Sequence, residues 1–265
     1  MTESVDRQHL QRQRLAATIA GRGDKGDTAM CEFCGNAGIA RRDLIRFGAA
    51  GALALALGGA APQARAATAL SPDEALAALK SGNARFVGNP QLCSDDFAAR
   101  RSAVASGQAP WATIVGCADS RTPPELIFGG HGLGELFVAR NAGNLVDTGT
   151  LGTVEYGAAV LGSPLIVVLA HTDCGAVKAA CDVVAKNATY PGAIGPMIEP
   201  ILPAVLAVRA EPGDFVNNAA RESAKRTAAR LTAASTLLAG LAGQGKLKIA
   251  AAIYDLETGI VAYLD

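Results

Sequence analysis

The sequence is poor in aromatic residues and carries no net charge. Phenylalanine, tryptophan and tyrosine make up 5% of the 265 residues, and 24 basic side chains balance 24 acidic ones. So few aromatic residues provide no stacking platform for single-stranded nucleic acid. A neutral chain also lacks the basic surface that attracts nucleic acids or anionic membranes. We therefore expect no nucleic-acid partner.

No apolar run near the amino terminus is long enough to be a clear membrane span. The run Phe47–Ala61 is about 15 residues long, whereas a helix needs about 20 to cross a bilayer. It follows the pair Arg41-Arg42 and precedes the small-x-small motif of residues 64–66. This order predicts a twin-arginine-type export signal over residues 1–66, a mature protein that begins near Ala67, a periplasmic location and no stable membrane insertion after cleavage. An uncleaved anchor is the alternative.

The chain has six cysteines, and their spacing is not that of a small disulfide scaffold. Cys31 and Cys34 form a C-x-x-C pair, but cleavage of the signal would remove them. Met30 offers an alternative start, which would make residues 1–29 an artefact of the start site. Of the cysteines that remain, we expect some to hold metal or to take part in chemistry.

Residues 67–265 alternate between apolar runs of strand length and helix-like stretches, which predicts a single α/β domain with a central, mostly parallel sheet flanked by helices. Continuous apolar runs such as "LIVVLA" indicate strands covered on both faces. The last residues, 254–265, resemble a hairpin that adds an antiparallel edge strand. The expected strands cover 111–116, 134–143, 163–170 and 246–255, and the expected helices cover 71–87, 97–106, 149–161, 175–186, 197–209 and 214–241.

Two clusters of ligand-type residues follow two of these strands. Cys117, Asp119 and Arg121 come after "ATIVG", and His171 and Cys174 come after "LIVVLA". In a parallel sheet the carboxyl ends of strands form the working edge. Alternate residues of an extended chain share a side, so the first three side chains can face one pocket. Two sulfurs, one imidazole and one carboxylate suit tetrahedral zinc with a position that can open, which is the pattern of a catalytic site.

At these residues the chain resembles the β-class carbonic anhydrases. The blocks "CADSR", "GELFVARNAGN", "GTVEYGAAVLG", "LIVVLAHTDCGAV", "ALKSGNARF" and "YDLETGIV" are similar to those of that family and stand in the same order. The resemblance covers about Ser71 to Leu264. It implies a lyase with one zinc ion per subunit, assembled as a homodimer or tetramer. Its reaction would be the reversible hydration of carbon dioxide to bicarbonate and a proton by a zinc-bound hydroxide.

The resemblance also implies roles for single residues. Cys117, His171 and Cys174 would be the fixed zinc ligands, and Asp119 would be an exchangeable ligand that pairs with Arg121 as the catalytic dyad. The substrate-binding residues would be Gln108, Phe137, Tyr156 and the backbone of Gly175.

Four positions need separate comment. Thr122 stands where the family commonly has valine, and Ile114 stands where bicarbonate-inhibited members have tryptophan, although Arg140 matches their binding arginine. His131 could be a proton shuttle, but a solvated loop histidine is the preferred interpretation.

Three other functions compete with carbon dioxide hydration. A related zinc hydrolase could act on carbonyl sulfide or carbon disulfide, which are linear molecules of the same type. A catalytically silent zinc-binding module would need none of Gln108, Asp119, Arg121 and Tyr156. A thiol oxidoreductase would need a C-x-x-C motif, which residues 67–265 lack.

Overall fold

The computed structural model describes residues 68–89 and 97–264. The predicted export signal, residues 1–66, and Cys93 lie outside these residues. Five strands form one sheet in the order β2-β1-β3-β4-β5, with β5 alone antiparallel to its neighbour. The strands are β1 (Ala112–Cys117), β2 (Leu136–Asn141), β3 (Leu165–His171), β4 (Lys248–Tyr254) and β5 (Val261–Leu264). The predicted fold class is confirmed.

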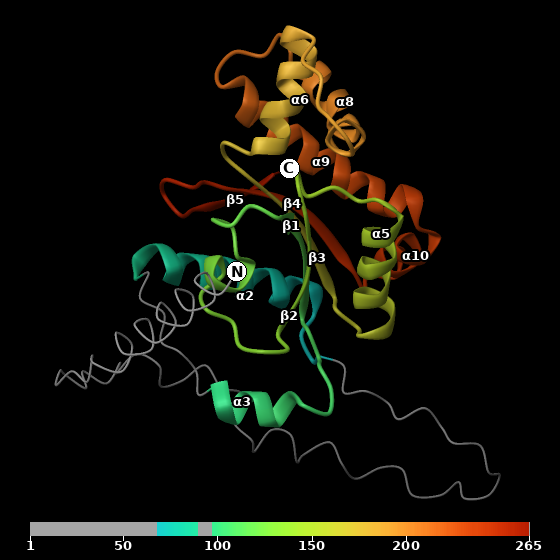
Figure 1. Ribbon diagram of the computed structural model, residues 1–265. Coiled ribbons are helices and arrows are strands. Elements are labelled where there is room, and N and C mark those ends of the chain that lie inside the picture. The colour runs from blue at the N-terminus through green and yellow to red at the C-terminus, as the bar shows by residue number, and fades with distance from the viewer. Residues whose placement is uncertain (1–67, 90–96, 265) are drawn as a thin grey trace, which may run out of the picture. The chain divides into compact units, whose positions relative to one another are not determined.

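Helices cover both faces of this sheet (Figure 1). Helix α9 packs against β3 and β4 on one face, and α2 packs against β3 on the other. The helical segments are α2 (Pro72–Gly88), α3 (Phe97–Val104), α4 (Pro124–Ile127), α5 (Thr148–Glu155), the π-helix η2 (Tyr156–Val160), α6 (Gly175–Lys186), α7 (Ile194–Ile198), the 3-10 helix η3 (Glu199–Ile201), α8 (Leu202–Ala207), α9 (Phe215–Ala234) and α10 (Thr236–Gly243). Among the described residues, none of these helices is long and apolar enough to cross a membrane.

The central strands β1 and β3 are buried along their whole length. Their side chains alternate between two separate apolar clusters, as the period of a strand requires. Val115 and Val168 lie in the cluster under α6, α8 and α9, whereas Ile114 and Val167 lie in the cluster under α2. Burial on both faces explains why these strands are continuous apolar runs in the sequence.

Two predicted helices are interrupted in the structure. The expected helix over 197–209 is broken into α7, η3 and α8, and prolines occupy positions 200 and 203. Proline has no N–H for the helical ladder and its ring crowds the preceding turn. The expected helix over 214–241 ends at Ala234, and Ser235, in an extended conformation, caps α10 by accepting a hydrogen bond from the Leu238 N–H. Serine favours such cap positions over helix interiors.

The order of the strands fixes where a site can form. From β1 the chain crosses to β2 on one side, and from β3 it crosses to β4 on the other side. The connections after β1 and β3 therefore diverge, and they leave a crevice beyond the carboxyl ends of these two neighbouring strands. Cys117 is the last residue of β1 and His171 is the last residue of β3, so both predicted ligands reach this crevice.

Asn83 joins α2 to two distant parts of the domain. Its Nδ2 donates to the carbonyls of Ile127 at 3.1 Å and Gly259 at 2.8 Å, and its Oδ1 accepts from the Val261 N–H at 2.9 Å. The side chain is buried. Each buried backbone group left without a partner costs about 1–3 kcal/mol.

We therefore expect Asn83→Ala to lower the free energy of unfolding by about 3 kcal/mol. Urea denaturation at a fixed protein concentration measures this change. Arg85→Ala is a suitable control, because Arg85 makes only an exposed contact with Ser81 on the same helix, and its effect should stay within about 0.5 kcal/mol. Equal stabilities of the two variants would contradict the role of Asn83.

Candidate metal centre

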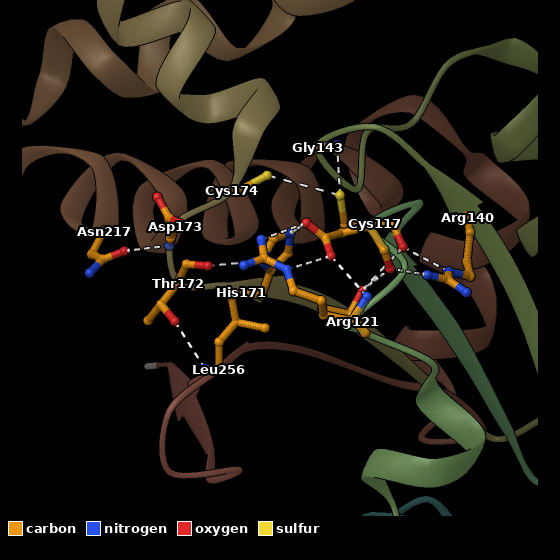
Figure 2. A network of polar contacts seen from close by, with 12 residues as sticks. Cys117, Arg121, Arg140, Gly143, His171, Thr172, Asp173, Cys174, Asn217 and Leu256 are labelled. Atoms are coloured by element: carbon orange, nitrogen blue, oxygen red, sulfur yellow. Dashed lines mark hydrogen bonds and ion pairs between the residues drawn. The ribbon is translucent and has the colours of Figure 1, made fainter.

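The structure brings Cys117, His171 and Cys174 together at the carboxyl ends of β1 and β3. One donor atom from each lies within 4.8 Å of the others, and all three residues are buried. The two Sγ atoms are 3.9 Å apart. Figure 2 shows the three side chains pointing toward a common point between the two strand ends. The expected convergence of the two motifs is therefore present.

The turn after β3 aims two of these residues at one point. Asp173 has a positive φ of 52°, a conformation that few residues other than glycine, asparagine and aspartate adopt readily. The Asn217 side chain on α9 accepts a hydrogen bond from the Asp173 N–H at 3.0 Å. The Thr172 N–H donates to the Tyr254 carbonyl at 2.9 Å. The turn is thus held by α9 and β4, and it returns the chain so that Cys174, the residue just before α6, lies beside His171.

The imidazole of His171 is oriented for a metal. Its Nδ1 lies 2.9 Å from the Thr172 carbonyl oxygen, an acceptor, so Nδ1 carries the proton. The other ring nitrogen, Nε2, is buried and has no hydrogen-bond partner. A buried polar atom without a partner is unfavourable, and a backbone carbonyl on one ring nitrogen is the usual way to direct the other toward a metal ion.

The two thiols compete for one proton. The hydrogen bond between the two sulfurs lowers the pKa of Cys117 to about 4, although burial acts to raise it. Contacts with His171 and the Gly143 N–H also lower this pKa. The same contact with Cys117, together with burial, raises the pKa of Cys174 far above its usual range. The contact therefore favours a thiolate at Cys117 and a protonated thiol at Cys174.

His171 responds to the same charge. Burial acts to lower the pKa of the imidazole, but the contact with Cys117 and the Cys117 charge outweigh it and raise the pKa. The surroundings of the three side chains, Cys117, His171 and Cys174, therefore favour a positive charge.

These features fit a zinc ion. Two sulfurs that are each 2.3 Å from a tetrahedral ion stand about 3.8 Å apart, close to the observed 3.9 Å. A divalent cation would remove the repulsion that keeps Cys174 protonated, so that both sulfurs could bind as thiolates. It would also satisfy Nε2 of His171. Cys117, His171 and Cys174 are the residues that would hold it.

Asp119 lies beside the three donor atoms but is turned toward Arg121. The Arg121 guanidinium makes two hydrogen bonds to the carboxylate, from Nε to Oδ1 at 2.9 Å and from Nη2 to Oδ2 at 2.8 Å. These bonds hold the pKa of Asp119 well below its usual range. Oδ2 is 3.9 Å from Nε2 of His171. The structure thus has the paired form of the predicted dyad, and the role of Asp119 as an exchangeable ligand stays a prediction.

The predicted substrate-binding residues are divided between two regions. Gly175 is the first residue of α6, and a Cβ built on it would meet nothing within 4 Å, so open space adjoins it. Phe137 instead pairs with Thr113 at the other end of β1, and Tyr156 packs against it with ring centroids 6.1 Å apart. Cys117 lies four residues further along β1, roughly 13 Å at about 3.3 Å per residue.

Gln108 also belongs to this far region, because it precedes Trp111 and the start of β1. One chain therefore does not bring Gln108, Phe137 and Tyr156 to its own metal centre. Their role in binding substrate stays a prediction.

The preferred interpretation of His131 as a solvated loop residue is wrong. Its Nδ1 lies 3.1 Å from the Glu135 carboxylate, and its ring packs edge-on against Trp111 with centroids 4.8 Å apart. The side chain is 12% exposed. Trp111 precedes β1, so this contact lies at the opposite end of the strand from Cys117. Within one subunit His131 is not placed to carry a proton from the metal centre.

Three further residues support this edge of the sheet: Gly143 and Asn217, which had no predicted role, and Arg140, which the resemblance matches to a binding arginine. The Gly143 N–H points at the Cys117 sulfur at 3.4 Å. Gly143 has a φ of 84°, and a Cβ there would come within 3.0 Å of Ile201. Arg140 and Asn217 fix the backbone beside Cys117 and His171. The block "VARNAG" at the end of the second strand gave a signal for Gly143 and Arg140, since it belongs to the same sheet edge, but nothing local indicated Asn217.

Comparison with known proteins agrees with this geometry. Residues 112–261 match the family described as carbonic anhydrase. Carbonic anhydrase 2 of Mycobacterium tuberculosis is 41% identical over 191 residues, which cover 71% of this chain and 91% of that protein. A carbonic anhydrase of Mycolicibacterium smegmatis is 37% identical over 191 residues, which cover 72% and 92% respectively.

Solved structures give the same result. The β-carbonic anhydrase CafA of Aspergillus fumigatus superposes with a TM-score of 0.57 at 26% identity and covers 73% of this chain and 90% of its own. A tetrameric β-carbonic anhydrase of Sordaria macrospora superposes with a TM-score of 0.56 at 27% identity and covers 71% and 95%. With these relatives and a Cys-His-Cys group at the ends of β1 and β3, the chain belongs to the β class of the carbonic anhydrase family.

Proposed function

We propose that this protein catalyses the reversible hydration of carbon dioxide to bicarbonate and a proton, with one zinc ion per subunit. The observation that carries this proposal is the buried Cys117-His171-Cys174 group with the Asp119–Arg121 pair beside it. Zinc, when bound, supplies the Lewis acid that lowers the pKa of water toward neutrality, so that hydroxide is available to attack carbon.

The side chains around the group would orient the reacting water. Arg121 lowers the pKa of Asp119 below its usual range, so the carboxylate stays charged at neutral pH and well into the acid range. A water molecule between the donor atoms and Asp119 would donate a hydrogen bond to the carboxylate, and its lone pair would then face carbon dioxide. Arg121 holds both carboxylate oxygens and so limits the rotation of Asp119. Arginine suits this role because its planar guanidinium can bind both oxygens at once, which lysine cannot.

The competing functions gain no support. The named relatives are carbonic anhydrases, and no contact in the described residues favours carbonyl sulfide or carbon disulfide as substrate. A catalytically silent zinc module would not require the Asp119–Arg121 pair, whose two hydrogen bonds are both well formed.

The metal-binding role is tested by Cys174→Ala. Removal of one sulfur leaves only two of the three protein donors, so we expect loss of stoichiometric zinc after dialysis and loss of hydration activity. Metal analysis and stopped-flow hydration measure the two effects. Cys181→Ala is the matched control, because Cys181 is a buried cysteine on the same helix that does not belong to the metal group. Zinc retained by the Cys174 variant would overturn the ligand assignment.

The role of Asp119 is tested by Asp119→Asn. The amide keeps the size of the side chain but removes the negative charge that accepts a hydrogen bond from water. We expect bound zinc to remain and kcat to fall by about 10²-fold, the lower end of the range for groups that handle protons. Glu125→Gln, a change at an exposed carboxylate on α4, should leave kcat unchanged. Full activity of the Asp119 variant would exclude this role.

We infer that the protein acts as an oligomer, either a homodimer or a tetramer. Gln108, Phe137 and Tyr156 lie too far along β1 and β2 to serve the metal centre of their own chain, and Tyr156 is 40% exposed. If these residues contact substrate, they do so in a site completed by a second copy. The related β-carbonic anhydrase of Sordaria macrospora is tetrameric, in agreement with an oligomer.

We further propose that residues 1–66 are a twin-arginine export signal, that residues 67–265 form the mature catalytic domain, and that the enzyme works in the periplasm without membrane insertion. The support is the order of Arg41-Arg42, the apolar run 47–61 and the cleavage motif at 64–66. In addition, the match to the Mycobacterium tuberculosis relative covers 91% of that protein but only 71% of this chain, which leaves room for an added segment.

The double variant Arg41→Lys, Arg42→Lys tests the route. Twin-arginine export depends on the arginine pair, so the protein should disappear from the periplasmic fraction and accumulate inside the cell as a longer precursor. Immunoblots of cell fractions and amino-terminal sequencing of the exported form measure this. Arg46→Lys serves as control. Unchanged export of the double variant, or an exported form that still contains residue 41, would contradict the proposal.

A further inference from the structure

Two backbone carbonyls in the turn after β1 receive an unusual set of donors. Arg140 on β2 donates from Nε to the Cys117 carbonyl at 2.7 Å and from Nη2 to the Asp119 carbonyl. The Thr122 hydroxyl lies 3.0 Å from the same Asp119 oxygen and 3.4 Å from the same Cys117 oxygen. Figure 2 shows the Arg140 guanidinium pointing at this turn, with dashed lines to the carbonyl oxygens.

These carbonyls lie where the sheet stops supplying partners. The last ladder bond between the two strands on this side runs from the Ala118 N–H to the Asn141 carbonyl at 3.0 Å. Beyond that point the chain leaves β2, and its carbonyls need donors from side chains or water. Bonds from a charged guanidinium are stronger than those from neutral donors, and the Nε–Nη2 edge of Arg140 spans both oxygens at once.

We propose that Arg140 and Thr122 are positioning residues that fix the Cys117–Asp119 turn and thereby set the place of the Asp119 carboxylate relative to the metal donors. The proposal rests on the function proposed above. Arg121 holds the Asp119 side chain, whereas Arg140 and Thr122 hold its backbone. Between them they leave the carboxylate little freedom, and misplacement of a catalytic group by about 1 Å can cost about 10²-fold in rate.

Thr122 adds a neutral donor to the same turn. Valine has the same shape as threonine without the hydroxyl, so Thr122→Val removes this donor alone. Thr122 is buried, at 3% exposure, and its N–H also donates to the Asp119 carbonyl at 3.1 Å. Because the hydroxyl has one proton, it can serve only one carbonyl at a time, and the shorter distance favours Asp119. Thr122 and Arg140 therefore act on the same oxygen, so their effects should be coupled.

The same contacts determine whether Arg140 can bind an anion, as the arginine that it matches in the resembling family does. The guanidinium edge formed by Nε and Nη2 is the one suited to two-point binding of a carboxylate or bicarbonate. In this structure that edge is engaged by the Cys117 and Asp119 carbonyls. A positioning role therefore accounts for the contacts that Arg140 makes.

A double-mutant cycle with Thr122→Val, Arg140→Lys and the combined variant tests the proposal, with Arg140→Met as a more severe change. The measurements are zinc content, kcat and KM for hydration, the visible spectrum of the cobalt-substituted protein, and the urea midpoint. Arg226→Met is the control, because Arg226 is an exposed arginine on α9 that pairs with Glu222.

We expect every variant to bind one zinc ion. Thr122→Val should lower kcat by less than about threefold, and Arg140→Met should lower it by about tenfold or more, with little change in KM. Arg140→Lys should recover part of the loss, since lysine can reach one carbonyl but cannot span two. The combined variant should lose more than the product of the single losses, and the cobalt spectrum should shift with Arg140→Met but not with Arg226→Met.

Independent effects of Thr122→Val and Arg140→Lys on kcat would overturn the proposal, as would a cobalt spectrum of Arg140→Met identical to wild type or a change confined to KM. If Arg140→Met does not fold, the cycle with the lysine variant decides the question. Absence of carbon dioxide hydration by the wild-type zinc protein would instead reject the proposed function, and the cobalt spectra and urea midpoints would still report on the turn.

Discussion

Two buried sulfur atoms 3.9 Å apart repel each other strongly when both are ionised, and a cation between them would remove that repulsion. This constraint explains most of the local structure at the carboxyl edge of the sheet. The contact between the two thiols lowers the pKa of Cys117 to about 4 and raises the pKa of Cys174. With zinc bound, the two thiols would no longer share one proton, and both sulfurs could bind the ion as thiolates. The neighbouring groups either donate to the thiolate, as the Gly143 N–H does, or stand ready to accept from water, as Asp119 does.

The supporting contacts come from three different elements, β2, α9 and β4. From β2, Arg140 holds the turn after β1; from α9, Asn217 holds the turn after β3; from β4, the Tyr254 carbonyl holds Thr172. Each of these contacts is made to backbone rather than to the metal donors themselves. Such contacts restrict where Cys117, His171 and Cys174 can point before any metal arrives, which is how supporting groups tune a metal site.

Two kinds of feature could be predicted from the sequence: elements with a regular hydrophobic pattern, and residues that lie at the end of a strand. Buried strands appear as continuous apolar runs, and parallel strands end at a common edge, so the meeting of Cys117 with His171 and Cys174 followed from topology alone. The helix breaks at Ser235 and at Pro200 and Pro203 were not predicted, although these residue types favour helix ends. In those segments the helical pattern of apolar residues continues across the break, so the pattern predicted one long helix despite the proline and serine residues.

The residues that were interpreted least well are those whose partners are distant in the chain. His131 is held by Trp111 and Glu135, and no local pattern shows that a loop histidine has an aromatic ring to pack against. For Phe137 and Tyr156, the position implied by the resemblance differs from the position in the fold. The family resemblance places them at the substrate, while the register of β1 and β2 places them at the far end of the strands from their own metal centre.

Both statements about these aromatic residues hold together only if the pocket of one chain is completed by residues of another. On that argument the metal donors, the dyad and the contacts that fix them belong to a single subunit, because they share one sheet edge. The part of the pocket wall formed by Phe137 and Tyr156 would come from a second subunit. An isolated chain would then bind zinc in the correct geometry and still lack part of its substrate pocket, so assembly would affect turnover without affecting metal content.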